Sequence, residues 1–262
     1  MTLSLEYSPC PNDTFIFYAM MHGKVDTEGL SFEVHLDDVE ALNQAARKGE
    51  FDITKLSFHA LAHIRDQYDL LDSGAALGNN CGPLLISKKP LKIEVDSDLS
   101  VAIPGQWTTA NFLLSYAYPQ LNNRKEMLFS KIENAVLKEE VDLGLIIHEN
   151  RFTYQEKGLH KVVDLGEFWE GQTGLPIPLG GIAIHSRYGD ETKQKVERVI
   201  RRSLEYAWDH VEETLPYLKE HAQEMDEAVM MQHVNLYVNG YTMSLGANGQ
   251  NAVEKVFEKI GD

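Results

Sequence analysis

The chain has 262 residues, 43% of them hydrophobic, which is enough for one large domain or two domains of ordinary size. Lysine and arginine total 24 against 40 aspartate and glutamate residues, so the formal net charge at pH 7 is -16. This surplus of negative charge argues against general binding to phosphate backbones or anionic membranes. We therefore expect neither nucleic acid nor a membrane as a partner.

The start of the chain and its two cysteines indicate a cytoplasmic protein. No charged and then apolar leader opens the sequence, and no run of about 18 apolar residues occurs in it. Cys10 and Cys81 are the two cysteines, and a reducing compartment favours two thiols over one disulfide.

The first part of the chain alternates short strands with amphipathic helices. Strands are predicted at residues 3–8, 31–36, 51–57 and 82–90, and helices at 14–23, 38–50 and 58–66. The last of these strands ends at a proline, so we place a break between domains near Pro90.

A second α/β series follows this break. It comprises a strand at 99–105, a helix at 109–119, a strand at 141–149, a turn-rich stretch at 171–181, a strand at 182–186 and helices at 191–211 and 251–261. The order predicts an α/β fold of two lobes, with residues 1–89 and 179–262 as discontinuous lobe I and residues 90–178 as inserted lobe II. Because the chain would cross twice between the lobes, we expect a ligand cleft between them.

Small and polar residues recur where predicted strands meet predicted helices. They form the stretches "SPCPNDT" (8–14), "TKLSFHA" (54–60), "GQWTTAN" (105–111) and "HENRFTY" (148–154). Ligands of α/β proteins collect beyond the carboxyl ends of strands, where helix N–H groups face a crevice. The same residue types are also the usual helix caps, and Asn12 and Asp13 are expected to cap a helix near Thr14 after a turn fixed by Pro11.

His148 ends an apolar run, residues 143–147, and is followed by the polar residues Glu149, Asn150 and Arg151. A titratable imidazole at the end of a buried strand is placed as a general base would be. A surface histidine, or one whose hydrogen bonds are satisfied in the core, is the alternative interpretation.

Six stretches together resemble the 1,4-dihydroxy-6-naphthoate synthases of the futalosine route to menaquinone. They are "SPCPNDTFIFYAM", "DITKLSFHA", "GNNCGPLLIS", "IPGQWTTANFLL", "DLGLIIHENRFTY" and "LPIPLGGIAI". The resemblance implies a two-lobed fold like that of type II periplasmic solute-binding proteins, with the substrate between the lobes. It also implies a reaction, in which cyclic dehypoxanthine futalosine yields 1,4-dihydroxy-6-naphthoate and dihydroxyacetone. The resemblance implies no redox cofactor and no metal.

The resemblance also assigns roles to individual residues. His148 matches the family's proposed catalytic base, and the matching substrate contacts are Lys55, Leu56 and Ser57 in one lobe and Thr109 and Ala110 in the other. The small-molecule substrate carries a carboxylate, which suits the helix starts at Ser57 and Thr109. An ordinary N-cap is the alternative for each of these two residues.

Ser8, Cys10, Asn12 and Trp107 are expected in the pocket wall. Cys10 as a nucleophile is disfavoured because no histidine follows it at a recognisable spacing and the reaction needs no covalent intermediate. Trp107, Trp169, Tyr154 and Phe152 could line a pocket for a flat aromatic product, or they could pack in the core.

We expect no metal site in this chain. His59 and His63 lie four residues apart on one predicted helix face, which resembles half of a zinc site. No HExxH glutamate or clustered cysteines accompany them, so packing within the helix is the favoured interpretation.

Two alternative functions remain, and the oligomeric state stays open. The same fold serves binding modules for small carboxylates, although the missing leader argues against export. The second alternative is chorismate dehydratase, the sibling enzyme of the same pathway on a similar fold. The histidine motif and "SPCPNDT" favour the naphthoate synthase.

Overall fold

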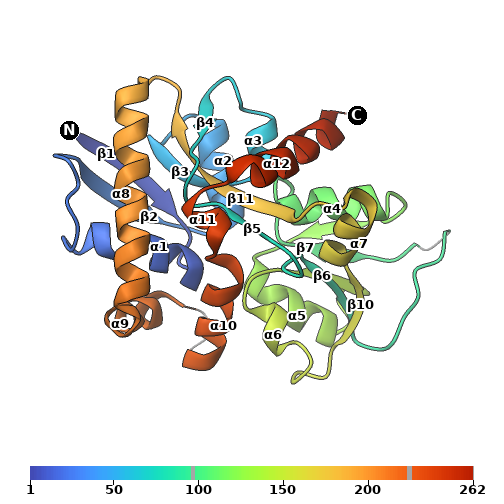
Figure 1. Ribbon diagram of the computed structural model, residues 1–262. Coiled ribbons are helices and arrows are strands. Elements are labelled where there is room, and N and C mark those ends of the chain that lie inside the picture. Colours follow the sequence, from blue (N-terminus) through green and yellow to red (C-terminus); the bar gives the residue numbers. More distant parts are fainter. Residues whose placement is uncertain (96–97, 223–225, 262) are drawn as a thin grey trace. The chain divides into compact units, whose positions relative to one another are not determined.

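The computed structural model describes residues 1–95, 98–222 and 226–261 of the chain. Contacts divide it into two compact α/β units, each with its own sheet (Figure 1). Unit 1 comprises Met1–Gly78 and Pro178–Asp262, and unit 2 comprises Asn79–Ile177.

The sheet of unit 1 is mixed and, among the described residues, six-stranded. Its order is β2-β1-β3-β11-β4, and β5 also pairs with β11. The strands are β1 Thr2–Tyr7, β2 Ser31–Leu36, β3 Ile53–Ser57, β4 Tyr68–Leu70, β5 Ala76–Gly78 and β11 Ile177–His185. β1 runs parallel to β2 and β3, whereas β11 runs antiparallel to β3 and β4. The late strand β11 thus completes a sheet that the first residues of the chain begin.

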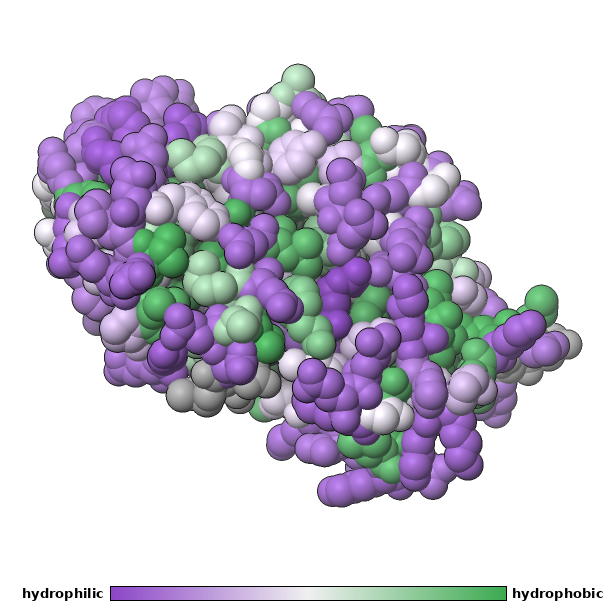
Figure 2. Space-filling model, turned by 60° about the horizontal axis from the view of Figure 1, so that its bottom comes forward, coloured by the Kyte–Doolittle hydropathy of each residue, from purple (hydrophilic) through white to green (hydrophobic). Residues whose placement is uncertain are grey.

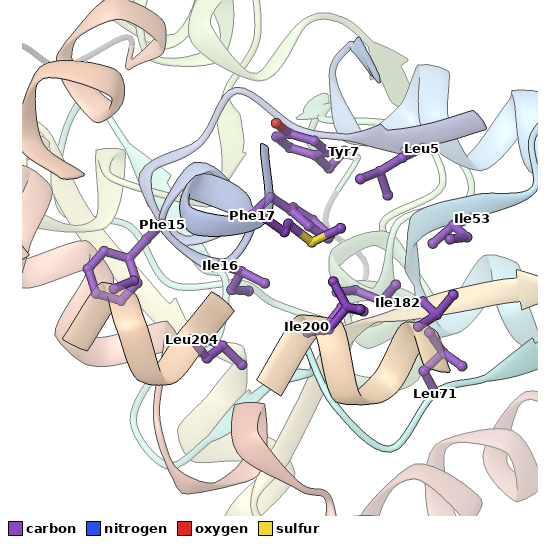
Figure 3. Packing of buried hydrophobic residues seen from close by; sticks show 14 of the residues in the cluster. Leu5, Tyr7, Phe15, Ile16, Phe17, Ile53, Leu71, Ile182, Ile200 and Leu204 are labelled. Carbon is purple, nitrogen blue, oxygen red and sulfur yellow. The ribbon is translucent and has the colours of Figure 1, made fainter. Parts of the chain in front are cut away.

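Helices cover this sheet and supply the other half of its core. They are α1 Pro11–Met21, α2 Val39–Arg47, α3 Phe58–Ala62, α8 Asp190–Asp209, α9 Val211–His221, α10 Glu227–Tyr237, α11 Gly240–Met243 and α12 Gly246–Gly261. Alternate residues of β1, such as Leu5 and Tyr7, point into the same buried cluster as Phe17 of α1 and Ile200 of α8 (Figure 3). The apolar stripe of α8 has the spacing that a helix packed along a core requires.

The sheet of unit 2 is five-stranded within the described ranges, with the order β10-β6-β9-β7-β8. The strands are β6 Leu84–Ser87, β7 Val101–Ile103, β8 Arg124–Glu126, β9 Leu143–Ile146 and β10 His160–Asp164, and the helices are α4 Thr109–Ala117, α5 Phe129–Leu137, α6 Asn150–Thr153 and α7 Leu165–Thr173. β9 is parallel to β7 and antiparallel to β6, and all its residues are buried. A strand buried on both faces reads as a continuous apolar run, which explains the pattern before His148.

The chain enters unit 2 earlier than the break predicted near Pro90. β6 was expected to close lobe I, but it pairs with β9 and β10 in the sheet of unit 2. The length and composition of β6 are compatible with either sheet. Its partner strands, which lie some 60 and 75 residues later in the sequence, determine that it joins the sheet of unit 2.

Two predicted element boundaries are also corrected. Helix α1 starts at Pro11 rather than near Thr14, because proline suits the first helical position. β11 starts at Ile177, inside the stretch predicted as turns, and includes Pro178. Its pairing with β3 begins only at Gly180, so the missing N–H of Pro178 costs no hydrogen bond in that ladder.

Hydrophilic residues cover much of the face shown in Figure 2, in keeping with the charge of the chain. Among the described helices, none combines the length and the apolar character needed to cross a membrane.

Close packing of α5 on β9 fixes the strand that precedes His148, and it generates the first prediction. A Cβ atom at Gly144 would lie 2.7 Å from Cγ2 of Ile132 and 2.8 Å from Cγ2 of Val136. Gly144→Ala should therefore lower the free energy of unfolding by about 1–3 kcal/mol through overpacking. Denaturant titration measures this loss. Gly171→Ala in α7 is the control, because a Cβ atom there meets nothing within 4 Å and alanine favours the helix. Equal stability of the two variants would contradict this account.

Candidate functional site

The loop after β1 carries the Pro-Cys-Pro sequence and leads directly into α1. Cys10 is the N-cap residue, and its carbonyl accepts the backbone N–H groups of Asp13 and Thr14, each at 3.1 Å. Asn12 and Asp13 thus lie inside the first turn of the helix, which corrects the prediction that they cap it. Their side chains are available for other bonds.

Those side chains form a buried polar network in unit 1. The hydroxyl of Ser8 donates to Oδ2 of Asp13 at 2.7 Å, and Nδ2 of Asn12 donates to Oδ1 at 2.8 Å. Nζ of Lys55, from the middle of β3, lies 2.8 Å from the same Oδ1 atom. The side chains of Asp13 and Lys55 are 3% and 7% exposed, so this ion pair has almost no contact with water.

The network continues to two segments distant in sequence. Nζ of Lys55 also donates to the carbonyl of Gly74 at 3.0 Å. Oδ1 of Asn12 lies 2.8 Å from Nε2 of His233, a fully buried residue of α10. Three other segments of unit 1, namely β3, α10 and the segment at Gly74, therefore hold the start of α1 and with it the loop after β1.

Ser57 ends β3 and occupies the N-cap position of α3, but its side chain makes no cap hydrogen bond. Its backbone N–H donates to Oδ1 of Asn43 at 2.9 Å, and its hydroxyl accepts from Nδ2 of Asn43 at 3.1 Å. The side chain of Leu56 is buried in the core. Of the predicted triplet, Lys55 and Ser57 therefore have structural partners within unit 1.

His148 lies in a turn between β9 and α6 of unit 2. Its φ of 57° is in the left-handed region, which a non-glycine residue adopts at a cost of about 1–2 kcal/mol. The half-buried imidazole meets the ring of Phe129 edge to face, with the centroids 5.1 Å apart. With this backbone conformation, the side chain of His148 points in a different direction than it would if strand β9 continued through this residue.

The segment after His148 is anchored at two points. Nδ2 of Asn150 donates to Oε2 of the buried Glu133 at 2.6 Å. The guanidinium of Arg151 donates to the carbonyl of Gly82 at 2.5 Å and to Oδ2 of Asp164 at 2.7 Å. α5 and the segments at β6 and β10 thus fix the end of the turn that carries the imidazole.

Thr109 and Ala110 open helix α4 in the same unit. The side chain of Thr108, the residue before them, caps the helix by accepting the N–H of Asn111 at 3.2 Å. That cap bond uses the third N–H of the helix and not those of Thr109 and Ala110. Both residues are buried, and Trp107, just before the cap, is half-buried.

Two of the four candidate pocket aromatics are core residues. Trp169 is fully buried and donates its Nε1–H to the carbonyl of Pro176 at 3.2 Å. Tyr154 belongs to the buried cluster of unit 2, and Phe152 is half-buried. The sequence alone could not separate these roles.

The cysteines and paired histidines have no site geometry of their own. Cys10 and Cys81 are buried, and burial raises the pKa of the Cys81 thiol to about 12, which disfavours the thiolate. The rings of His59 and His63 lie 5.3 Å apart, and burial, followed by the charge of Arg47, lowers the pKa of His63. Among the described residues, no group of three or more histidine, cysteine or acidic side chains is placed to hold a metal ion.

The predicted residues thus form one set in each unit. Ser8, Asn12 and Lys55 share the network around Asp13 in unit 1, and Ser57 lies two residues from Lys55. His148, Thr109, Ala110 and Trp107 belong to unit 2. The ion-pairing role of Asp13 was not predicted from the sequence, and neither were the contributions of His233 and Asn43, whose partners lie 221 and 14 residues away.

Two mixed α/β units built from a chain that crosses between them twice define a protein of the periplasmic-binding-protein-like class. A solved structure from Archaeoglobus fulgidus is similar over 99% of this chain and 97% of its own, with a TM-score of 0.94 and 36% sequence identity. A Candida albicans gene product described as having the generic periplasmic binding protein fold matches with a TM-score of 0.67 and 13% identity, over 100% and 90% of the two chains. The predicted fold class is confirmed.

The family model described as "Menaquinone biosynthesis" matches residues 3–262, and the chain belongs to this family. A 1,4-dihydroxy-6-naphthoate synthase of Thermus thermophilus is 46% identical over 97% of this chain and 92% of its own length. The corresponding synthase of Streptomyces coelicolor is 43% identical over 96% and 90%. The resemblance recognised in the sequence is therefore confirmed.

The buried ion pair predicts an asymmetric response to mutation. Lys55→Met should lower the free energy of unfolding by about 3–5 kcal/mol, because it leaves the carboxylate of Asp13 buried without its cation. The double variant Asp13→Asn, Lys55→Met should recover part of that loss, since no buried charge remains. Urea unfolding of the parent, the two single variants and the double variant measures both effects, and additive losses in the double variant would contradict them.

Proposed function

We propose that this protein converts cyclic dehypoxanthine futalosine to 1,4-dihydroxy-6-naphthoate and dihydroxyacetone, with His148 as the general base. The observation that carries the proposal is the identity of 46% and 43%, over nearly the whole chain, to two proteins named as this synthase. The position of His148 after a buried strand of unit 2 supports the role given to it.

The reaction needs a base more than it needs any other group. The base removes a proton beside a carbonyl of the spirocyclic substrate, and the electron pair of that C–H bond moves toward the carbonyl. The carbon–carbon bond to the three-carbon fragment breaks, and the proton held by the base returns to that fragment as it leaves as dihydroxyacetone. The two products together contain every atom of the substrate, so no oxidant or reductant is consumed.

The surroundings of His148 suit this task. The ring is half-buried against Phe129, and its backbone is held by the anchors of Asn150 and Arg151. A base held in one orientation and partly shielded from water is effective because its lone pair stays directed at one position. The strained φ of His148 is consistent with a position retained for function.

The carboxylate of the substrate has a binding position at the start of α4. The N–H groups at the beginning of a helix and its dipole attract anions. Thr109 and Ala110 are the first two residues of this helix, and we assign the contact to their N–H groups and to the hydroxyl of Thr109. A local site of this kind needs no basic surface, which agrees with a net charge of -16.

Incubation of the purified protein with cyclic dehypoxanthine futalosine tests the proposal. Naphthoate absorbance should appear with this substrate and not with chorismate, which separates the synthase from the dehydratase. Saturable binding without turnover would instead favour a solute-binding module.

His148→Asn should lower kcat by about 10²–10⁴-fold with little change in the folded structure, because asparagine keeps a polar group but cannot act as the base. The acid limb of the rate profile, where an imidazole base becomes protonated, should vanish in the variant. Steady-state kinetics over a range of pH measure both effects. His160→Asn, an exposed histidine of β10 in the same unit, is the matched control and should keep the parent profile. Turnover of His148→Asn within a few-fold of the control would remove the assigned base.

Thr109→Ala should act on binding rather than on chemistry. The variant keeps the backbone N–H groups but loses the hydroxyl, and loss of its one charge-assisted hydrogen bond, worth about 1.5–3 kcal/mol, should raise KM by about 10–150-fold while kcat stays within a few-fold. An unchanged KM for the natural substrate would place its carboxylate elsewhere.

A further inference from the structure

A pocket lies in unit 1, between helix α2 and the carboxyl end of the edge strand β2. Its volume is about 440 Å³, which falls in the range of small-molecule sites. Its lining includes Glu6, His35, Leu36, Asp37, Lys48, Glu50 and Phe51. None of them belongs to the sets around Asp13 or His148, so the pocket is independent of the reaction proposed above.

Glu6 is the unusual member of this lining. It lies on β1, opposite His35 of β2, on the face of the sheet that does not carry Leu5 and Tyr7. Only 5% of the residue is exposed, and its Oε2 atom has no hydrogen-bond partner among the described residues. A buried carboxyl oxygen without a partner is costly, so its retention calls for an explanation.

Among the described residues of the pocket wall, no cation pairs with Glu6. Lys48 is the single lysine or arginine in the described lining, and its Nζ atom lies 3.5 Å from Oε1 of Glu50. The side chain of Lys48 is 67% exposed, so it belongs to the rim. Asp37 accepts the backbone N–H of Asp38 at 2.8 Å and adds a further negative charge.

The lining fits an organic cation better than a metal ion. Within the described residues no set of three acidic, histidine or cysteine side chains is arranged to hold a metal. The ring of Phe51, 5.2 Å from that of His35, and Leu36 offer apolar surface beside the carboxyl groups. A cation with a hydrocarbon stem satisfies both parts of the wall.

We propose that this pocket binds a small aliphatic primary amine, whose ammonium group pairs with Glu6 and whose hydrocarbon stem lies against Phe51. The ammonium group can donate to Oε2 of Glu6 and, at the rim, to Asp37 or Glu50. The occupant is a free amine rather than a protein side chain, because the volume of the pocket suits a small molecule and the anchoring carboxyl is buried.

Protonation of Glu6 should be linked to this binding. Burial, and then the charges of Asp37 and Glu50, raise the pKa of Glu6 to about 8. The titratable and charged groups around it are His35, Asp37, Lys48, Glu50 and Tyr68. An ammonium ion binds the carboxylate form, so binding at pH 7 should release about one proton, and affinity should increase about tenfold between pH 7 and pH 9.

Isothermal titration calorimetry with 1,4-diaminobutane tests the proposal on the full chain. Titrations at pH 7 in two buffers of different ionisation enthalpy count the released protons, and 1,4-butanediol is the uncharged control ligand. We expect saturable binding of the diamine, none of the diol, and tighter binding at pH 9, where aliphatic amines remain largely protonated. Absence of saturable diamine binding, or equal binding of the diol, would overturn the proposal.

Variants connect the binding to Glu6. Glu6→Gln resembles the protonated acid in shape and should weaken diamine binding at least tenfold at pH 9 and abolish proton release. Glu205→Gln removes one charge from an exposed position on α8 of the same unit and should change neither. Equal affinities of the two variants would show that Glu6 is not the anchor.

Two further arms complete the test. If Glu6→Gln does not fold, Glu50→Gln replaces it. Because Glu50 is a charge at the rim, its loss should lower the affinity for the diamine about twofold at low salt. Unchanged affinity of this variant would count against the site. Nα-acetyl-lysine amide carries the amine of a protein side chain on the same kind of stem. Tighter binding of this compound than of the diamine would overturn the assignment to a free amine.

Discussion

The ion pair between Asp13 and Lys55 organises the part of unit 1 where sequence motifs and structure meet. Two buried charges 2.8 Å apart are stable only with further hydrogen bonds, and Ser8, Asn12 and the carbonyl of Gly74 provide them. The bonds to Asp13 restrain the loop between β1 and α1, and the bond to Gly74 holds Lys55 in place. The Pro-Cys-Pro sequence sets the turn, and the ion pair then fixes it to β3, so the loop has little freedom to adapt.

In unit 2, a backbone conformation rather than an ion pair plays the corresponding role. His148 has a left-handed φ, and Glu133, Asp164 and the carbonyl of Gly82 hold the residues that follow it. Strain at one residue persists only where its neighbours over-determine the conformation. Unit 1 thus fixes the loop after β1 with a buried ion pair, whereas unit 2 fixes the side chain of His148 with a strained backbone conformation and its anchors.

The sequence predicted the class of fold well because periodicity is a local signal. The buried strand before His148 and the amphipathic helix α8 were recognisable from their own residues. The sheet that β6 joins could not be recognised in this way, because its partners β9 and β10 lie far along the chain. The same limit applies to the candidate site. Lys55 and Ser57 lie in a strand-end motif that could be picked out as a candidate, whereas His233 and Asn43 carry no local sign that they contact Asn12 and Ser57.

Two buried carboxyl groups on neighbouring segments of unit 1, those of Asp13 and Glu6, differ in how their charge is balanced. Asp13 has a cation and two donors, so its charge is balanced within the protein. Glu6, seven residues earlier, faces Asp37 and Glu50, and burial together with these charges raises its pKa to about 8. The energy of placing Glu6 there is lowest when it is protonated or when a cation from outside joins it. The protonation of Glu6 therefore depends on pH and on bound cations, whereas the charge of Asp13 is balanced by the fold itself. This difference separates a structural carboxylate from one suited to binding.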